Sequence, residues 1–476
     1  MSEQPKSRLP WALALPARVL LVAGAAFALL SCDDTRQEVE RRAAEVIGEA
    51  ATARLTGSGE GMERAADLIN IPVEVRPLAE GVYQARGVAN THMVATDEGK
   101  VVFDTGFALQ AAKQRRLLQE TVPDGPVTHV ILSHSHADHS GGTRFWLEDG
   151  VEIVAHQEFP EEQRYLKELE PYLHYRNRTL FPFIPEKPPN IGFLRYGGIE
   201  PTILVGNGEP YRFELGGTRF EVIGTPGAEG ADNLVLWLPE QKILFSGDFF
   251  GPNFPQFPNV FTMRGEKIRK PIEYIHSLNR VIALEPEMIV PSHNDPITGR
   301  EKIRADLVRM RDAVQYVHDA IIAGMNAGKT VHELMAEITL PPELELRQTH
   351  GRVSWAVKSI WEYYATWFHF DSTTELYAVP ASTIYPELVE LAGVDALVER
   401  ARRHIAAQEP VQALHLLDIA LGSETDDRAA LEARRAALQI LLDDAEAGLR
   451  NSYEIDWLRY RLRETEERLG AAPAAG

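Results

Sequence analysis

The chain of 476 residues is almost without cysteine, since Cys32 is the only one. One thiol cannot form an intrachain disulfide bond. Because Cys32 also lies close to the N-terminus, a metal site in the folded body must use nitrogen and oxygen ligands. Histidine and the acidic side chains provide such ligands.

Clusters of basic residues are also missing. The chain has 49 Lys and Arg against 69 Asp and Glu, a formal net charge of −20. Without a basic block we expect no nucleic-acid partner. A strongly acidic surface disfavours adsorption to anionic lipid. An anionic small-molecule substrate would therefore depend on positive charge inside its own site.

The apolar run near the N-terminus is short for a membrane span. Val19–Leu30 supplies roughly 12 residues where a spanning helix needs ~20. Basic residues precede it, and Leu29-Leu30-Ser31-Cys32 ends it, as in a secretory signal. This cysteine resembles that of the bacterial lipobox, which is acylated and becomes the new N-terminus. We expect residues 1–32 to be a lipoprotein signal peptide with lipidation at Cys32. A plain transmembrane anchor that includes Leu9–Ala17 is the alternative.

The lipobox resemblance also predicts where the chain is found. It implies a bacterial cell-envelope protein that faces the periplasm. Contact with the membrane would be made only through the lipid anchor.

Three stretches follow the signal. Residues 33–70 are charged and Ala-rich with apolar residues at helical spacing, which predicts a helical spacer. Residues 71–300 mix short β-branched runs with helical patterns, which predicts an α/β domain of two sheets with helices outside. Residues 301–470 are helical almost throughout and predict an all-α domain. Within the α/β part, residues 157–200 are rich in proline and aromatics. They are either an insertion over a site mouth or a packed loop.

The most informative motif is Ser133-His134-Ser135-His136-Ala137-Asp138-His139. It follows the apolar run Val127–Leu132, so a loop at the end of a strand can aim all four ligand-type side chains into one space. His134 and His136 can serve one metal ion, while Asp138 and His139 turn to a second.

Acidic or histidine residues follow several other apolar runs in the same domain. Asp104 closes Val101–Phe103, where we expect it to orient a ligand histidine rather than bind metal. Similar positions are held by three more candidates, Glu229, Asp248 and His293. The repeated pattern predicts a site at the ends of the strands.

This motif set resembles the metallo-β-lactamase fold over residues 71–300. The resemblance implies a four-layer αββα sandwich with two metal ions, zinc first and manganese or iron as alternatives. It makes His134, His136 and Glu229 the ligands of the first ion. The second ion would be held by Asp138, His139 and His293, and Asp248 would bridge the two ions.

Glu229 stands where most of that superfamily has histidine, and Thr-Pro-Gly-x-Glu is similar to the alkylsulfatase branch. Asn259-Val260-Phe261-Thr262-Met263-Arg264-Gly265 resembles a segment of that branch, and residues 301–470 resemble its helical dimerisation domain. The resemblance therefore implies a homodimer. Two departures stand out, because Asp248 replaces the usual bridging glutamate and Trp355 replaces a histidine thought to bind sulfate.

For substrate binding we select Arg264 first, since a guanidinium can chelate two oxygens of a sulfate or phosphate. A surface arginine is the alternative interpretation. Asn259 and His350 are weaker candidates.

The favoured function is hydrolysis of an alkyl sulfate or related ester by metal-activated hydroxide, with Asp138 or Glu229 handling the proton. The substrate would be anionic with an apolar tail. Hydrolysis of another ester, a lactone, a thioester, a phosphodiester or a β-lactam is the second hypothesis. A non-enzymatic envelope protein with a relict metal site is the third.

Overall fold

The computed structural model describes residues 33–55, 71–181, 184, 186–187, 197–227, 229–422 and 426–471. The signal peptide and Cys32 lie outside the described residues. Lipidation and cell-envelope localisation therefore stay predictions. Among the described residues, no helix is both long and apolar enough to cross a membrane.

The first sheet has seven strands in sequence order, from β1 to β7. Strands β1 to β4 pair antiparallel, and β4 to β7 pair parallel. The strands are β1 (Val75–Ala79), β2 (Val82–Ala85), β3 (Thr91–Ala95), β4 (Lys100–Phe103), β5 (Val127–Ile131), β6 (Glu152–His156) and β7 (Ile203–Val205).

The second sheet has six strands in the order β13-β12-β11-β10-β9-β8, and only β11 and β12 run parallel. Its strands are β8 (Tyr211–Leu215), β9 (Thr218–Gly224), β10 (Leu234–Leu238), β11 (Ile243–Gly247), β12 (Met288–Pro291) and β13 (Ile297–Thr298). β10 and β11 are buried along their whole length, as their continuous apolar runs require.

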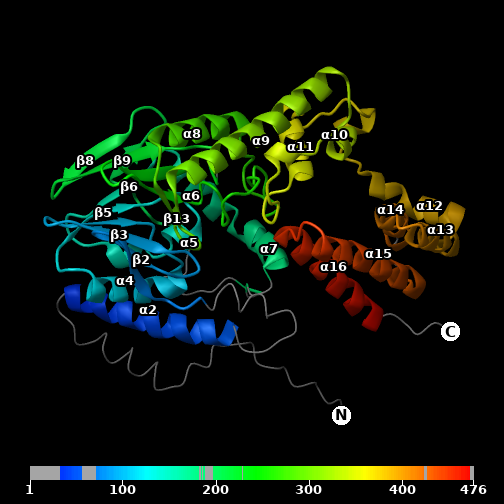
Figure 1. Ribbon diagram of the computed structural model, residues 1–476. Coiled ribbons are helices and arrows are strands. Elements are labelled where there is room, and N and C mark those ends of the chain that lie inside the picture. The colour runs from blue at the N-terminus through cyan, green and yellow to red at the C-terminus, as the bar shows by residue number, and fades with distance from the viewer. Residues whose placement is uncertain are drawn as a thin grey trace, which may run out of the picture.

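The two sheets pack face to face, with helices on both outer faces (Figure 1). Apolar side chains from both sheets, such as Phe103 and Phe245, form the core between them. α4 (Ala108–Thr121) covers the first sheet, and α8 (Pro271–Leu284) with α9 (Arg300–Asn326) covers the second. The predicted αββα sandwich is confirmed.

α2 (Asp33–Leu55) corresponds to the helix expected in residues 33–70. It does not stand away from the body as a spacer would. Ala44 is buried against Ala111 of α4, and the Glu45 carboxylate accepts hydrogen bonds from Arg116. α2 therefore adds an outermost layer to the sandwich.

The segment 157–200 contains two helices that were not predicted from its proline-rich and aromatic sequence. They are α6 (Phe159–Glu168) and α7 (Glu170–Leu180). Each begins with a proline in its first turn, where the missing N–H costs nothing. Phe183 and Phe193 lie outside the described residues.

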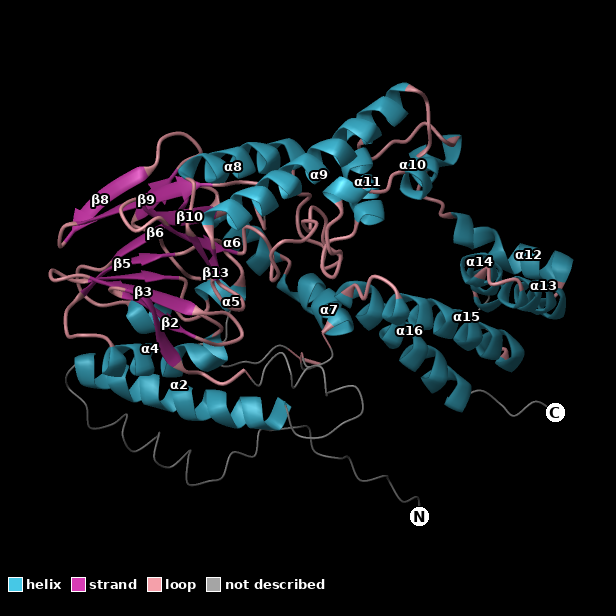
Figure 2. Cartoon of the chain, viewed as in Figure 1, coloured by secondary structure: helices cyan, strands magenta, loops and turns pink. Residues whose placement is uncertain are grey.

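The C-terminal region is helical, as predicted (Figure 2). α9 was expected to open the separate helical domain at 301, but its apolar stripe packs on the second sheet. Hydrophobic burial therefore places α9 with the sandwich. The remaining helices are α10 (Val331–Glu337), α11 (Val353–Ala365), α12 (Tyr385–Ala392), α13 (Val394–Ala406), α14 (Pro410–Leu421), α15 (Arg428–Ala447) and α16 (Ser452–Ala471).

Candidate metal centre

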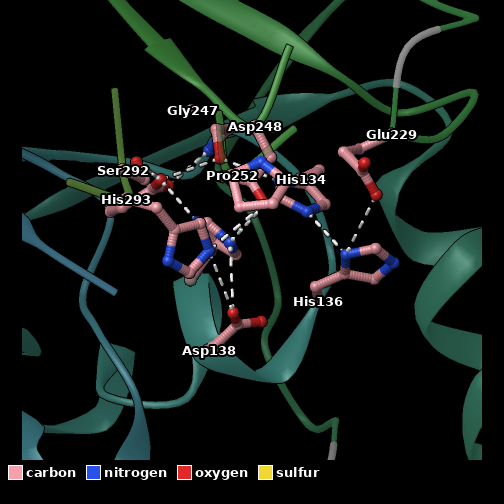
Figure 3. Close-up of polar contacts among 12 residues, drawn as sticks. His134, His136, Asp138, Glu229, Gly247, Asp248, Pro252, Ser292 and His293 are labelled. Carbon is pink, nitrogen blue, oxygen red and sulfur yellow. Dashed lines mark hydrogen bonds and ion pairs between the residues drawn. The ribbon is translucent and has the colours of Figure 1, made fainter. Parts of the chain in front are cut away.

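The seven predicted ligand residues come together at one end of the two sheets (Figure 3). The loop after β5 and the short helix α5 (Ala137–Ser140) carry four of them. Asp248 follows β11, His293 follows β12, and Glu229 lies in the turn after β9. The strand ends of both sheets thus supply one site from four segments of the chain.

Three of these residues form what we call the Glu229 half, namely His134, His136 and Glu229. His134 Nε2 lies 2.7 Å from His136 Nδ1, and His136 Nδ1 lies 3.8 Å from Glu229 Oε2. One ligand atom from each residue falls within 4.8 Å of the others. His134 and Glu229 are buried.

The other three form the His293 half, namely Asp138, His139 and His293. His293 Nε2 lies 3.4 Å from Asp138 Oδ2, and His139 Nε2 lies 3.5 Å from the same oxygen. Asp248 Oδ2 is 3.3 Å from His293 Nε2 and 3.5 Å from His139 Nε2. Asp248 also clusters with His134 and His139, so it touches both halves.

Asp104 is a buried carboxylate that supports the candidate metal centre from below the ligand loop. Its carboxylate accepts hydrogen bonds from Ser133 N and Ser133 Oγ, both at 2.8 Å, and from Ser292 Oγ. It also pairs with His139 Nδ1 at 2.9 Å. As expected, it orients a histidine and leaves the opposite nitrogen free to face the cluster.

Gly247 makes the turn that delivers Asp248. Its φ of +54° lies in the left-handed region, and a Cβ there would stand 2.4 Å from Ser133 Cβ. Only glycine fits both conditions. β11 can therefore end against the histidine loop.

The residues fit metal ions on two observations. His139 Nε2 and Asp248 Oδ1 are buried and have no hydrogen-bond partner within the described residues. Such orphaned atoms call for an ion or water. Two imidazole nitrogens also face each other at 2.7 Å in the Glu229 half. Buried histidine and aspartate clusters of this kind are consistent with a binuclear metal site.

Electrostatics favour positive charge in the His293 half. Burial opposes protonation of His293, but Asp248 and Asp138 raise its pKa to about 10. Burial likewise opposes ionisation of Asp138, yet His139 and His293 hold its pKa well below its usual range. Metal ions compete with protons for such groups.

Comparison with known families and structures gives the family and the fold. Residues 85–293 match the metallo-beta-lactamase superfamily model, and residues 330–461 match the alkyl sulfatase dimerisation model. The chain joins a metallo-beta-lactamase domain to an alkyl sulfatase dimerisation domain. It is distantly homologous to alkylsulfatases.

A linear primary-alkylsulfatase of Pseudomonas sp. (strain ATCC 19151) is 28% identical over 63% of this chain and 60% of its own length. An alkyl/aryl-sulfatase of Saccharomyces cerevisiae is 24% identical over 81% of this chain and 63% of its own. The chain thus spans about three fifths of these relatives.

A solved inverting secondary alkylsulfatase of Pseudomonas sp. superposes with a TM-score of 0.70 at 21% identity. The superposition covers 89% of this chain and 71% of that structure. At this identity the likeness shows the shared fold.

Beside the Glu229 half, the metallo-beta-lactamase domain holds a network of two arginines and two glutamates, in which Glu229 and Arg269 are buried. Arg269 donates to Glu229 Oε2 at 2.7 Å and to Glu266 Oε2 at 3.0 Å. Arg264 lies 3.0 Å from Glu266 Oε1 and 3.9 Å from Glu229 Oε2. Arg264 is therefore no surface residue, and its buried Nε–H has no acceptor within the described residues.

The two weaker substrate-binding candidates lie at the same place. Asn259 is buried, its main-chain oxygen accepts from Arg269 at 2.7 Å, and its Oδ1 has no partner among the described residues. His350 comes within hydrogen-bonding range of Asn259, at 3.5 Å. Burial lowers the pKa of His350 to about 3, so its ring is neutral.

We call the side chains of Asn259, Arg264, Glu266, Arg269 and His350 the wall of the site. The C-terminal helices reach this wall through a set of hydrogen bonds that we call the Asn451 clasp. Asn451 Nδ2 donates to the carbonyls of Gln348 and His350, and Ser452 N donates to Thr349 O. The next residue, Tyr453, packs its ring 4.8 Å from His350. Burial raises the pKa of Tyr453 to about 12, so it stays a hydrogen-bond donor.

Trp355 makes apolar and cation–π contacts. It lies in the first turn of α11, packs edge-on against Phe261 and is covered by the Arg352 guanidinium. The position usually held by histidine in the alkylsulfatase branch is therefore apolar here.

Sequence reasoning missed several residues of the site. Glu266, Arg269 and Tyr453 were not selected, although Glu266 and Arg269 lie within five residues of Arg264. Asp232 was also missed. Its carboxylate accepts from Ser135 N at 2.8 Å, and burial raises its pKa to about 7.

Proposed function

We propose that the chain is a binuclear metal-dependent hydrolase of alkyl sulfates or related sulfate esters. The observation that carries the proposal is the adjacency of the His and carboxylate clusters to the partly buried Arg264. Bound zinc, or manganese or iron, supplies Lewis-acid activation of water near neutral pH.

The residues then have distinct roles. His134, His136 and Glu229 hold one ion, Asp138, His139 and His293 hold the other, and Asp248 is shared. Asp138 would accept the proton of the activated water, because its side chain is 33% exposed. The side chain of Glu229 is 5% exposed and is fixed by Arg269. Between the two predicted proton carriers, exposure thus favours Asp138.

Arg264 and Asn259 bind the anionic end of the substrate. The unpartnered Nε–H of Arg264 is a donor for a sulfate oxygen. Fixed donors of this kind stabilise charge that develops on a leaving group.

The α6–α7 insertion covers the Arg264 segment. Arg176 of α7 donates to Met263 O at 2.6 Å, and Lys267 pairs with Glu162 of α6 at 2.9 Å. Phe181, which follows α7, lies 6.1 Å from the Tyr453 ring. These aromatics favour an apolar tail on the substrate, as in an alkyl ester.

The test is a substrate panel on fully metallated protein starting at Asp33. We expect turnover of p-nitrophenyl sulfate or long-chain alkyl sulfates, loss of it after chelation, and recovery with zinc or manganese. Glu229→Ala should abolish it. Turnover of a lactone, thioester, phosphodiester or β-lactam with both sulfate esters intact would contradict the sulfatase proposal.

We further propose that the protein is a homodimer through the segment from Trp367 to Leu391. Trp367 is 72% exposed, Phe370 is 87% exposed and Leu391 is 84% exposed. Exposed apolar side chains that are concentrated in one segment mark an interaction site. A second copy is the partner favoured by the dimerisation model that spans this segment.

Light scattering on the double variant Trp367→Glu, Phe370→Glu tests the dimer. We expect the mass to fall from dimer to monomer at micromolar protein. Val46→Glu on α2, where the residue is also 51% exposed, is the matched control and should stay dimeric. A monomeric parent protein would contradict the proposal.

A further inference from the structure

Glu266 lies where the metal centre meets the arginines. Its side chain is only 9% exposed, and it contacts three charged or ligand-type groups. These are His136 Nε2 at 3.3 Å, Arg264 at 3.0 Å and Arg269 at 3.0 Å. Glu229 also pairs with both arginines and lies 3.8 Å from His136 Nδ1, whereas Glu266 pairs with the opposite ring nitrogen, His136 Nε2.

The two ring nitrogens of His136 face opposite sides, one toward the other predicted ligands and one toward Glu266. Nδ1 faces His134 Nε2 and Glu229, which is the side of the predicted first ion. Nε2 faces away, toward Glu266. An imidazole that gives one nitrogen to a metal carries its proton on the other, and an acceptor there fixes the tautomer and ring orientation.

The same carboxylate limits the charge of the anion-binding wall. Arg264 and Arg269 bring two positive charges, while Glu266 pairs with both and Glu229 takes a second bond from Arg269. A substrate sulfate must therefore share Arg264 with Glu266. Pairing that is already satisfied lowers the gain from a new anion.

We propose that Glu266 is a positioning residue that orients His136 for the first metal ion and holds Arg264 partly neutralised beside it. The inference rests on the proposed function for the identity of the anion. It does not need turnover to be tested. Metal binding and inorganic sulfate binding report its two contacts separately.

The test uses Glu266→Gln and Glu266→Ala in the full mature chain. Gln keeps an oxygen that accepts from His136 Nε2–H but loses the charge. We expect Glu266→Ala to bind the first ion about 10–100-fold more weakly, whereas Glu266→Gln stays within about threefold of the parent protein. At saturating zinc, both variants should bind inorganic sulfate about tenfold more tightly by titration calorimetry.

Glu240→Gln is the matched control. Glu240 pairs with Arg219, and both side chains are largely exposed. Both affinities should equal those of the parent protein. The proposal is overturned if Glu266→Ala keeps parental metal affinity, or if sulfate binds the Gln variant no better than the parent. A failed sulfate-ester panel with these binding results intact would overturn only the proposed function.

Discussion

The two halves of the metal centre are held by different kinds of partner. In the His293 half, His139 pairs with the buried Asp104, and His293 Nδ1 faces the main-chain oxygen of Val88 at 2.7 Å. In the Glu229 half, Glu229 pairs with Arg269 and His136 pairs with Glu266, and both partners belong to the wall. Only His134 of that half reaches Asp104, through Ser133.

The difference means that one half is held by groups that serve only the predicted metal ligands, whereas the other half is held by groups that we also propose for substrate binding. The His293 half is tied to the sandwich itself, so its geometry does not depend on what enters the site. The Glu229 half shares its supports with the groups that we propose bind the substrate. Changes in the wall should therefore reach one ion, whereas changes in the sandwich should reach both.

The largest effect should come from removing the residue that the halves share. Asp248→Ala should release metal from both halves and lower turnover about 1,000-fold, since metal activation contributes several kcal/mol. Metal analysis after gel filtration measures the first effect and the rate measures the second. A variant that keeps two ions would show that Asp248 is not shared.

Asp104→Asn should be next. It removes the acceptor of His139 Nδ1–H and of two serine hydroxyls, so metal affinity should fall about 10–100-fold in both halves. Unfolding should also become easier, by about 2 kcal/mol, because buried groups lose their partners. Thermal and denaturant unfolding measure this, with exposed Asp149→Asn as the control. Loss confined to one ion would break the comparison.

Arg269→Ala should act on one half only. It removes the 2.7 Å bond to Glu229, and we expect about tenfold weaker binding of one ion. Metal content should fall from two ions per chain toward one after mild chelation, with the His293 half retained. Equal loss from both halves would show that the wall supports the whole centre.

The smallest effects should come from two serines. Ser133→Ala removes a hydroxyl that contacts His134 Nδ1 at 2.9 Å as well as Asp104. Ser292→Ala removes a hydroxyl whose one side-chain partner among the described residues is Asp104. A single hydrogen bond contributes about 1 kcal/mol, or a few-fold in affinity. Competition with a chromogenic chelator should show the Ser133 effect in the Glu229 half and the Ser292 effect in the His293 half.

The sequence was sufficient for the sandwich and for the meeting of the seven predicted ligands, because both depend on local patterns. Apolar runs predict the strands, and polar residues just after them lie at strand ends by construction. Two short strands were not predicted. β7 is apolar but only three residues long, Ile203–Val205, and β8 alternates exposed charged side chains with apolar ones, so neither gives a long apolar run.

The wall beside the ligands could not be derived in the same way. Glu266 and Arg269 lie in a segment without helix or strand between β11 and α8, so no periodicity predicts where they point. Their partners are set by pairing between charges that burial brings together. The position of Tyr453 beside His350 could not be predicted, because the helices α11 to α15 separate the two residues and their contact is set by the tertiary fold.

The Asn451 clasp has a consequence for how the molecule is made. Translation proceeds from the N-terminus, so every predicted metal ligand from His134 to His293 leaves the ribosome before Asn451 and Tyr453. The main-chain oxygens of residues 348–350 can accept their hydrogen bonds from Asn451 and Ser452 only after those two residues have been synthesised. Tyr453 therefore joins His350 beside the site only after every predicted metal ligand has been synthesised.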